Sequence, residues 1–233
     1  MKLAGCTDRL RRGCSAAACV ATCRQTAELI DAKFAARRAE GAAIACAAGC
    51  AFCCHQRVGV YAHEAVALLS RLRELESHAA AAIEARIRAN ARAVDSMTAE
   101  QHRAANLPCA FLVEGRCAAY EVRPLACARY HSLSRARCEQ AFAHPEDAGT
   151  PRNSRPALAE LQALGDALAA ATDGALEAAG LSSARGELHQ LLHALLESPA
   201  LVEHWSAGAD IAAVTIRTPQ REPRSSTTPS SVP

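Results

Sequence analysis

Residues 46–55 read CAAGCAFCCH, and residues 108–138 read PCAFLVEGRCAAYEVRPLACARYHSLSRARC. The first stretch spaces its cysteines as C-x3-C-x2-C-C, and the second spaces them as C-x7-C-x9-C-x10-C. Thiols on short loops are typical of tetrahedral zinc and iron–sulfur centres, because one loop that supplies two ligands closes the site at a low entropic cost. The two stretches therefore predict a metal centre with the ligands Cys46, Cys50, Cys53, Cys54, Cys109, Cys117, Cys127 and Cys138.

The number of thiols leaves the form of this centre open. Eight exceed the four ligands of one tetrahedral ion, so two mononuclear sites, a small multinuclear cluster, or one centre with additional structural cysteines all fit. The side chains of adjacent Cys53 and Cys54 diverge, so either one of them is not a ligand or the site holds more than one metal. Cys46 lies one helical turn before Cys50 and would share its face if this segment were helical.

Composition indicates one or two compact domains with a thin core. The chain has 233 residues, of which half are hydrophobic but only 3% are aromatic. Small side chains bury little area each, so a metal that ties loops together would add stability that such a core lacks. The net charge of +2 is too small to indicate a nucleic-acid partner, and no apolar run is long enough to cross a bilayer.

The N-terminus bears on the compartment. A Leu-Ala-Gly-Cys string ends at Cys6 and resembles a lipoprotein cleavage box, but only Met1 and Lys2 precede it and the apolar region is missing. We therefore expect a reducing, cytoplasmic environment, in which twelve cysteines indicate metal or redox chemistry before disulfides. The spacing of the four N-terminal cysteines matches no site, and we expect them to be packing or mobile residues: Cys6, Cys14, Cys19 and Cys23.

Hydrophobic periodicity predicts an all-α fold, a helical domain with a small irregular cysteine-rich insert and a minor hairpin. The hairpin is expected at Phe111–Val113 and Cys117–Tyr120, joined by a turn at Glu114 and Gly115, and Gly49 is expected to provide a second tight turn. Helices are expected over residues 22–45, 64–75, 79–97, 157–180 and 184–198.

The same patterns suggest a division of the chain. We predict a cysteine-containing N-terminal arm over residues 1–23 and a cysteine-cluster metal-binding domain over residues 24–143. Two C-terminal helices follow over residues 157–206, after a linker rich in proline and polar residues. Residues 217–233 are rich in Ser, Thr and Pro and are expected to be disordered.

Together these segments resemble the CxxCxxCC cysteine-cluster family, also called the YkgJ-type zinc- or iron-chelating domain. The resemblance rests on GCAFCC at residues 49–54, HEA at 63–65, PCAFL at 108–112 and GRCAAYEVRPLACAR at 115–129. It implies metal chelation in a bacterial cytosolic protein and leaves the metal and any reaction open. Six thiols match the family motifs, whereas Cys46 and Cys138 lie outside them: the six are Cys50, Cys53, Cys54, Cys109, Cys117 and Cys127.

Three classes of function remain open from the sequence. The leading hypothesis is a metal-binding protein of unknown physiological role, which holds zinc, iron or an iron–sulfur cluster. Some proteins with a similar cysteine pattern are flagellin lysine N-methylases, which implies an iron–sulfur enzyme of methylase-like or redox type, although no glycine loop for S-adenosylmethionine follows a strand here. A metal carrier or storage protein is the third class.

The C-x3-C-x2-C spacing also occurs in radical S-adenosylmethionine sites, but the β/α barrel of those enzymes needs strands that this chain is not predicted to have.

Several residues beside the clusters have two interpretations. His55 and His131 could be nitrogen ligands, although a lone histidine is more often hydrogen-bonded or at the surface. Arg123 and Arg129 could offset thiolate charge and donate N–H groups to sulfur, or could lie solvated at the surface. A histidine pair four residues apart suits a metal geometrically, but we expect a surface pair on one helix: His189 and His193.

Overall fold

The computed structural model describes residues 4–11, 14–146 and 156–212, and this part of the chain confirms the all-α class with a minor hairpin. The α-helices are α1 (Ala4–Arg11), α2 (Ala16–Ala39), α3 (Ala62–Arg73), α4 (Ser77–Asp95), α5 (Ala99–Ala104), α6 (Leu125–Ala128), α7 (Arg135–Ala143), α8 (Ala159–Ala178), α9 (Leu188–Glu197) and α10 (Ala200–Ser206). Two short 3-10 helices and four short strands complete it: η1 (Phe52–His55), η2 (Tyr120–Val122), β1 (Gly59–Tyr61), β2 (Leu112–Val113), β3 (Arg116–Cys117) and β4 (Arg185–Glu187).

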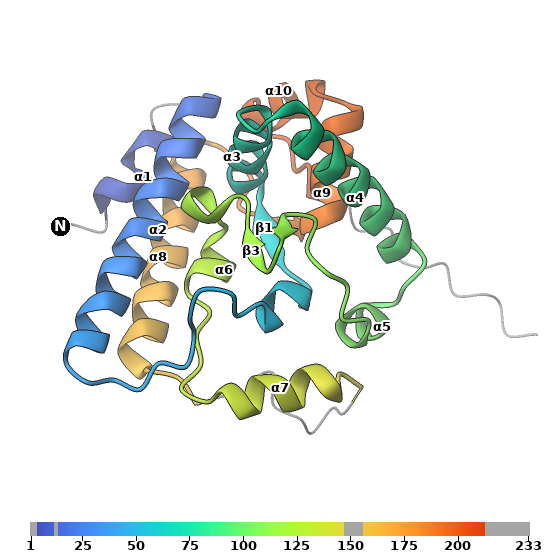
Figure 1. Ribbon diagram of the computed structural model, residues 1–233. Coiled ribbons are helices and arrows are strands. Elements are labelled where there is room, and N and C mark those ends of the chain that lie inside the picture. The colour runs from blue at the N-terminus through green and yellow to red at the C-terminus, as the bar shows by residue number, and fades with distance from the viewer. Residues whose placement is uncertain (1–3, 12–13, 147–155, 213–233) are drawn as a thin grey trace, which may run out of the picture.

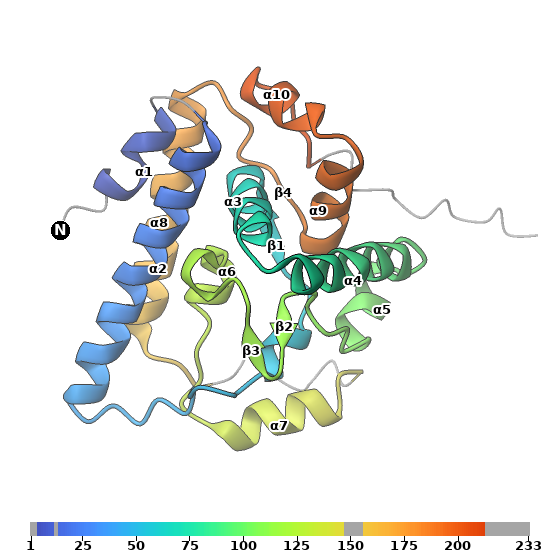
Figure 2. The same cartoon turned by 45° about the horizontal axis from the view of Figure 1, so that its top comes forward.

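Two groups of helices make up the body of the protein (Figure 1). In the first group α1, α2 and α8 contact one another, and in the second α9 contacts α3, α4 and α10. Contact between α2 and α3 joins the two groups. The segment that follows α2, the β2–β3 hairpin and α6 lie between them, and α7 covers one end (Figure 2). The cysteine-rich stretches therefore lie where the helical groups meet.

The first long helix begins and ends elsewhere than the predicted range of 22–45. It begins at Ala16 because the Ser15 side chain accepts a hydrogen bond from the Ala18 amide, which satisfies one of the N–H groups that lack a helical partner. It ends before Gly41, whose φ of 91° suits glycine and interrupts the helix. Residues 42–51 are consequently not helical, so Cys46 and Cys50 do not share a helix face.

The core confirms the predicted apolar stripes. In α3, Val66, Leu68, Leu69 and Leu72 are buried, and in α4 the buried residues include Ile83, Ile87 and Val94. Burying one such aliphatic side chain contributes about 1.5–3 kcal/mol. The helix α10 was not expected; it brings Trp205 into the core, where the indole Nε1 donates to the Ser182 carbonyl at 3.3 Å.

The hairpin has the predicted turn. Leu112 pairs with Cys117 and Val113 with Arg116, and the two residues between them have positive φ values of 49° for Glu114 and 74° for Gly115. Two consecutive residues of positive φ are typical of the tight turns that match the twist of paired strands.

A second strand pair was missed by the sequence analysis. Antiparallel pairing of β1 with β4 matches Gly59 with Glu187 and Tyr61 with Arg185. Each strand has only three residues, so its alternation is too short to be recognised. The pairing places the start of α9 beside the start of β1, where the Leu188 amide donates to the Val58 carbonyl at 3.0 Å.

The predicted disordered tail at 217–233 lies outside the described residues, as does most of the predicted linker. The division into a domain over 24–143 and helices over 157–206 stays a prediction. No helix within the described ranges is long and apolar enough to cross a membrane.

Close packing of α6 against α8 gives a first prediction. A Cβ atom at Gly165 would lie 2.6 Å from Cδ and 2.9 Å from Cβ of Arg129, whose guanidinium pairs with Asp166 at 2.5 Å. We expect Gly165→Ala to lower the free energy of unfolding by roughly 1–3 kcal/mol, because Arg129 must move. Thermal unfolding followed by circular dichroism measures the effect.

Gly174 in the same helix is the matched control. A Cβ atom there would meet nothing within 4 Å, so Gly174→Ala should raise stability by about 0.4–1 kcal/mol through a less flexible unfolded chain. Equal effects of the two substitutions would contradict the packing of Arg129 on α8.

Candidate metal centre

The first cysteine stretch forms a loop that leads into η1. Gly49 has a φ of 83° and forms the expected turn. The amide of Cys50 donates to the Ala47 carbonyl at 3.0 Å, and the amide of Cys54 donates to the Ala51 carbonyl at 2.9 Å. These turns hold Cys46 and Cys50 on the loop and place Cys53 and Cys54 on the 3-10 helix.

The second stretch distributes its cysteines over four successive pieces of backbone. Cys109 precedes β2, Cys117 ends β3, Cys127 lies on α6 and Cys138 lies on α7. These short elements differ in direction, so their thiols can approach one region from different sides.

Backbone hydrogen bonds join the two stretches. The amide of Cys109 donates to the Cys54 carbonyl at 2.8 Å, and the amide of Ala45 donates to the Ser132 carbonyl at 2.9 Å. The ring of Phe142 in α7 packs edge-on against the rings of Phe52 and His55 in η1, with centroids 5.6 and 5.0 Å apart. The loop and η1 are therefore held between α7 and the hairpin.

The electrostatic neighbours of the thiols define two sets. Burial raises the pKa of Cys46, and the neighbouring thiols Cys53, Cys50 and Cys138 raise it further. Burial likewise raises the pKa of Cys127 well above its usual range, and Cys109, Cys53 and Cys117 act in the same direction. We call the first four thiols the loop set and the second four the hairpin set. Cys53 belongs to both.

The adjacent pair Cys53 and Cys54 has two different surroundings. The Cys53 thiol acts on Cys46 in the loop set and on Cys117 and Cys127 in the hairpin set. Cys54 instead provides the carbonyl that binds the amide of Cys109. The geometry thus gives Cys53 a central place among the thiols and Cys54 a role in the backbone frame.

Backbone N–H groups are directed at several sulfur atoms. Phe111 donates to the Cys109 sulfur and Ala119 to the Cys117 sulfur, in each case two residues further along the chain, and Ser132 donates to the Cys46 sulfur. Such donors lower the thiol pKa and oppose burial, which is the largest cause that raises it; for Cys109 burial prevails and the pKa is raised to about 12. N–H groups aimed at sulfur suit a thiolate ligand, so the donor set fits a bound metal.

Across the described part of the chain, however, no three Cys, His, Asp or Glu side chains lie close enough together to hold a metal ion. The thiols are neighbours at electrostatic range and do not converge on one point. Ligation therefore requires the thiols to move closer together and to lose their protons.

The arginines beside Cys127 have different roles. Arg123 is buried, donates to the Tyr120 carbonyl at 2.8 Å and pairs with Asp31, and its charge lowers the pKa of Cys117. Its charge therefore does oppose that of the hairpin set. Arg129 pairs with Asp166 on α8 and packs on that helix.

The histidines beside the clusters also differ. His131 is fully buried; its Nε2 accepts from the Leu158 amide at 2.8 Å and its Nδ1 lies 3.0 Å from the Arg129 carbonyl. Both ring nitrogens thus bind backbone, and His131 fastens the start of α8. His55 Nδ1 lies 3.0 Å from the Ala51 carbonyl, a contact that leaves the lone pair on Nε2, as a metal ligand requires.

The N-terminal cysteines and the predicted histidine pair on α9 lie outside the two cysteine-rich stretches. Cys19 and Cys23 are buried in the core, as expected for packing residues, and the side chain of Cys6 lies outside the described residues. The expectation that His189 and His193 form a surface pair is wrong for His189, which is only 4% exposed and hydrogen-bonded. The β1–β4 pairing, which the sequence analysis missed, carries this residue inward.

Glu64 is a second residue whose role was not foreseen. Its Oε2 accepts from the Tyr61 amide at 2.9 Å and its Oε1 accepts from the Leu125 amide at 2.7 Å. The first bond caps α3, as a glutamate at the third helical position often does. The second holds the first residue of α6, which carries Cys127. Only the cap has a sequence signal, because the partner in α6 is sixty-one positions away.

The comparison with family models agrees with this geometry. Residues 45–148 match the family CxxCxxCC, described as "Putative zinc- or iron-chelating domain". This segment is similar to the CxxCxxCC domain. The match spans both the loop set and the hairpin set and ends before α8, so α8, α9 and α10 lie outside it. No curated protein and no solved structure matches the chain.

The burial of Glu64 in the matched segment predicts a pH dependence in the metal-free protein. Burial raises the pKa of Glu64 from 4.5 to about 6. A pKa that is higher in the folded state adds stability below about pH 4.5, and this stability is lost as the pH rises through about 6. The difference corresponds to roughly 2 kcal/mol. Urea unfolding measures this effect. Between pH 4 and pH 7, the free energy of unfolding of wild type should fall by about 2 kcal/mol more than that of Glu64→Gln, because glutamine does not titrate.

Exposed Glu74 at the end of the same helix provides the control. Glu74→Gln makes the same chemical change at a side chain that is 53% exposed, so it separates the effect of burial from that of the substitution. If Glu64→Gln and Glu74→Gln change the pH dependence of the free energy of unfolding equally, the burial of Glu64 is not the cause of that dependence.

Proposed function

We propose that this protein binds zinc or iron through the thiolates of the loop set and the hairpin set. The observation that carries the proposal is the position of Cys53, which is an electrostatic neighbour of thiols in both sets. The family match supports the general chemistry of zinc or iron chelation. The proposed ligands are Cys46, Cys50, Cys53, Cys109, Cys117, Cys127 and Cys138, with Cys54 as an eighth thiol at the edge of the site.

Two sets that share Cys53 favour a pair of linked metal positions. The thiols of each set would hold a metal ion, and Cys53 would be available to both sets. Bound in this way, zinc would supply structural cross-linking and iron or an iron–sulfur cluster would supply electron transfer. The protein's own contribution is to hold the thiols, to donate N–H groups to sulfur, and to offset negative charge with Arg123.

The cytoplasm of a bacterium is the proposed location. The described cysteines are free thiols, and a reducing compartment keeps them available for metal. The methylase-like, redox and carrier hypotheses remain possible uses of the same centre. Calorimetric titration with S-adenosylmethionine tests the methylase-like hypothesis, because a protein that gives no heat of binding does not use this cofactor.

Elemental analysis of anaerobically purified protein tests the proposal. A colourless protein with stoichiometric zinc identifies a zinc centre, and a brown protein with acid-labile sulfide identifies an iron–sulfur cluster. A protein that contains neither metal and takes up neither Zn²⁺ nor Fe²⁺ would contradict the proposal.

Serine substitutions test the shared position of Cys53. We expect Cys53→Ser to lose metal from both sets and Cys127→Ser to lose metal from the hairpin set alone, so Cys53→Ser should retain less metal per chain. Metal content by elemental analysis is the measurement, with the thermal unfolding midpoint as a second readout. Both midpoints should fall, because metal binding stabilises the folded state.

The matched control is Cys14→Ser, at a thiol outside both sets. It should keep the metal content of wild type. Unchanged metal content in both Cys53→Ser and Cys127→Ser would refute the ligand assignment.

A further inference from the structure

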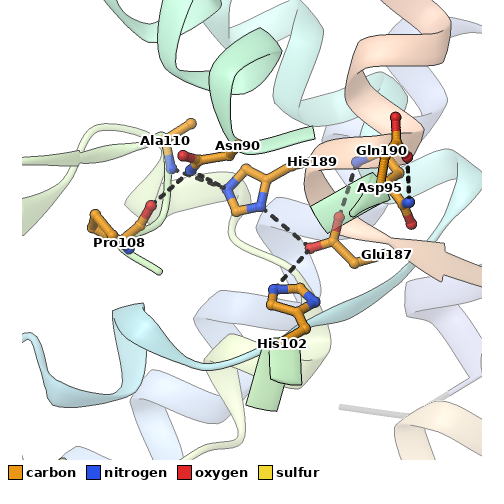
Figure 3. A network of polar contacts seen from close by, with 8 residues as sticks. All are labelled: Asn90, Asp95, His102, Pro108, Ala110, Glu187, His189 and Gln190. Atoms are coloured by element: carbon orange, nitrogen blue, oxygen red, sulfur yellow. Dashed lines mark hydrogen bonds and ion pairs between the residues drawn. The ribbon is translucent and has the colours of Figure 1, made fainter. Parts of the chain in front are cut away.

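The backbone on both sides of Cys109 is bound by partners from three other segments, two of which, Asn90 and His189, are shown in Figure 3. The carbonyl of Pro108 accepts from Asn90 Nδ2 at 2.8 Å. The amide of Cys109 donates to the Cys54 carbonyl at 2.8 Å, and the amide of Ala110 donates to Nε2 of His189 at 3.2 Å. Three consecutive backbone groups are therefore fixed, and with them the direction of the Cα–Cβ bond that carries the thiol.

Glu187 determines which tautomer the His189 imidazole adopts. Glu187 Oε1 lies 3.2 Å from Nδ1 of His189, and its Oε2 accepts from the Gln190 amide at 2.9 Å. Because a carboxylate only accepts, the proton of the imidazole is on Nδ1 and the lone pair is on Nε2. This tautomer is the one that can accept from Ala110. Asn90 Nδ2 lies 3.1 Å from the same Nε2 and adds a second donor.

The network is enclosed by protein. Asn90, His102, Glu187 and His189 are each at most 9% exposed, and Nε2 of His102 lies 4.0 Å from Glu187 Oε1. Burial tends to raise the pKa of Glu187, but the hydrogen bonds that its carboxylate accepts from His189 and from the Gln190 amide outweigh it and leave the pKa lowered. Glu187 thus stays a carboxylate and keeps its partner oriented.

Glu187 and His189 lie outside the matched domain, on β4 and the first turn of α9. The β1–β4 pairing brings them to the Cys109 loop. Their arrangement parallels the carboxylate–histidine pairs that orient groups in metal centres, except that here the imidazole holds an amide beside a ligand and not the metal.

We propose that Glu187 and His189 are positioning residues for the Cys109 thiolate, so that the C-terminal segment completes the metal centre of the CxxCxxCC domain. This inference rests on the proposed function. Loss of the imidazole leaves the buried Ala110 amide without its acceptor and Glu187 Oε1 without its donor from His189, and the Cys109 loop loses one of its three backbone anchors. Substitution of such supporting groups typically lowers metal affinity by about 10- to 100-fold.

The test uses Co²⁺ as the probe, added anaerobically to the full metal-free chain. The variant His189→Leu keeps roughly the volume of the side chain and removes its hydrogen bonds with Glu187, Ala110 and Asn90. We expect a 10- to 100-fold weaker Co²⁺ affinity by competition with a chelator. We also expect a weaker thiolate-to-cobalt charge-transfer band per bound ion, because one thiolate no longer reaches the metal. A general loss of stability would not change the spectrum of the bound fraction.

Two further variants of the network sharpen the test. His189→Gln retains an N–H donor for Glu187 and an oxygen acceptor for Ala110, so it should restore the spectrum and bring the affinity to within about threefold of wild type. Should His189→Leu fail to fold by circular dichroism, Glu187→Gln carries the same expectation of a weakened band, because it has the native size and lacks the carboxylate. His193→Ala, one turn further along α9, is the control and should match wild type.

The outcomes separate the two proposals. If wild type binds no Co²⁺, Zn²⁺ or Fe²⁺, the proposed function fails and the positioning role with it. If wild type binds Co²⁺ and folded His189→Leu or Glu187→Gln gives the same affinity and the same band, the positioning role alone is overturned. Failure of His189→Gln to restore the band would likewise overturn it.

Discussion

The hydrogen bond from the amide of Cys109 to the carbonyl of Cys54 joins the two cysteine-bearing stretches of this protein. The segments that meet there are otherwise short and irregular, so neither could fix the other by helical packing. On one side of this bond η1 packs against α7, and on the other the hairpin leads into α6. The neighbourhood of Cys53 with thiols from both stretches depends on that junction.

Buried polar groups maintain the junction in a protein with few large side chains. Glu64 holds the start of α6, and Glu187 with His189 holds the loop of Cys109. Each carboxylate is costly to bury and is offset by the amides and the imidazole that it binds. Such networks are directional, unlike contacts between alanines, and can therefore fix the orientation of short loops. In both cases the carboxylate belongs to a helix start and the cysteine segment to another element.

Much of the fold followed from local pattern. The apolar stripe of Leu68, Leu69 and Leu72 and the Glu114–Gly115 turn depend on neighbours within a few residues, and both are confirmed. The first long helix was misplaced because Ser15 and Gly41 decide its ends more strongly than its apolar positions do. Strand β4 and the burial of His189 were missed because their partners in β1 and at Ala110 are distant in the chain.

The sequence alone determined the chemistry available to this protein: eight closely spaced thiols, the all-α class, and the similarity of residues 45–148 to the CxxCxxCC family. These follow from residue identity and short-range periodicity. Only the tertiary structure decided which thiols are neighbours, why adjacent Cys53 and Cys54 differ, and which residues outside the motif support the site. Spacing along a chain constrains nearby atoms only, whereas the meeting of residues 54, 109 and 189 results from the packing of helices far apart in sequence.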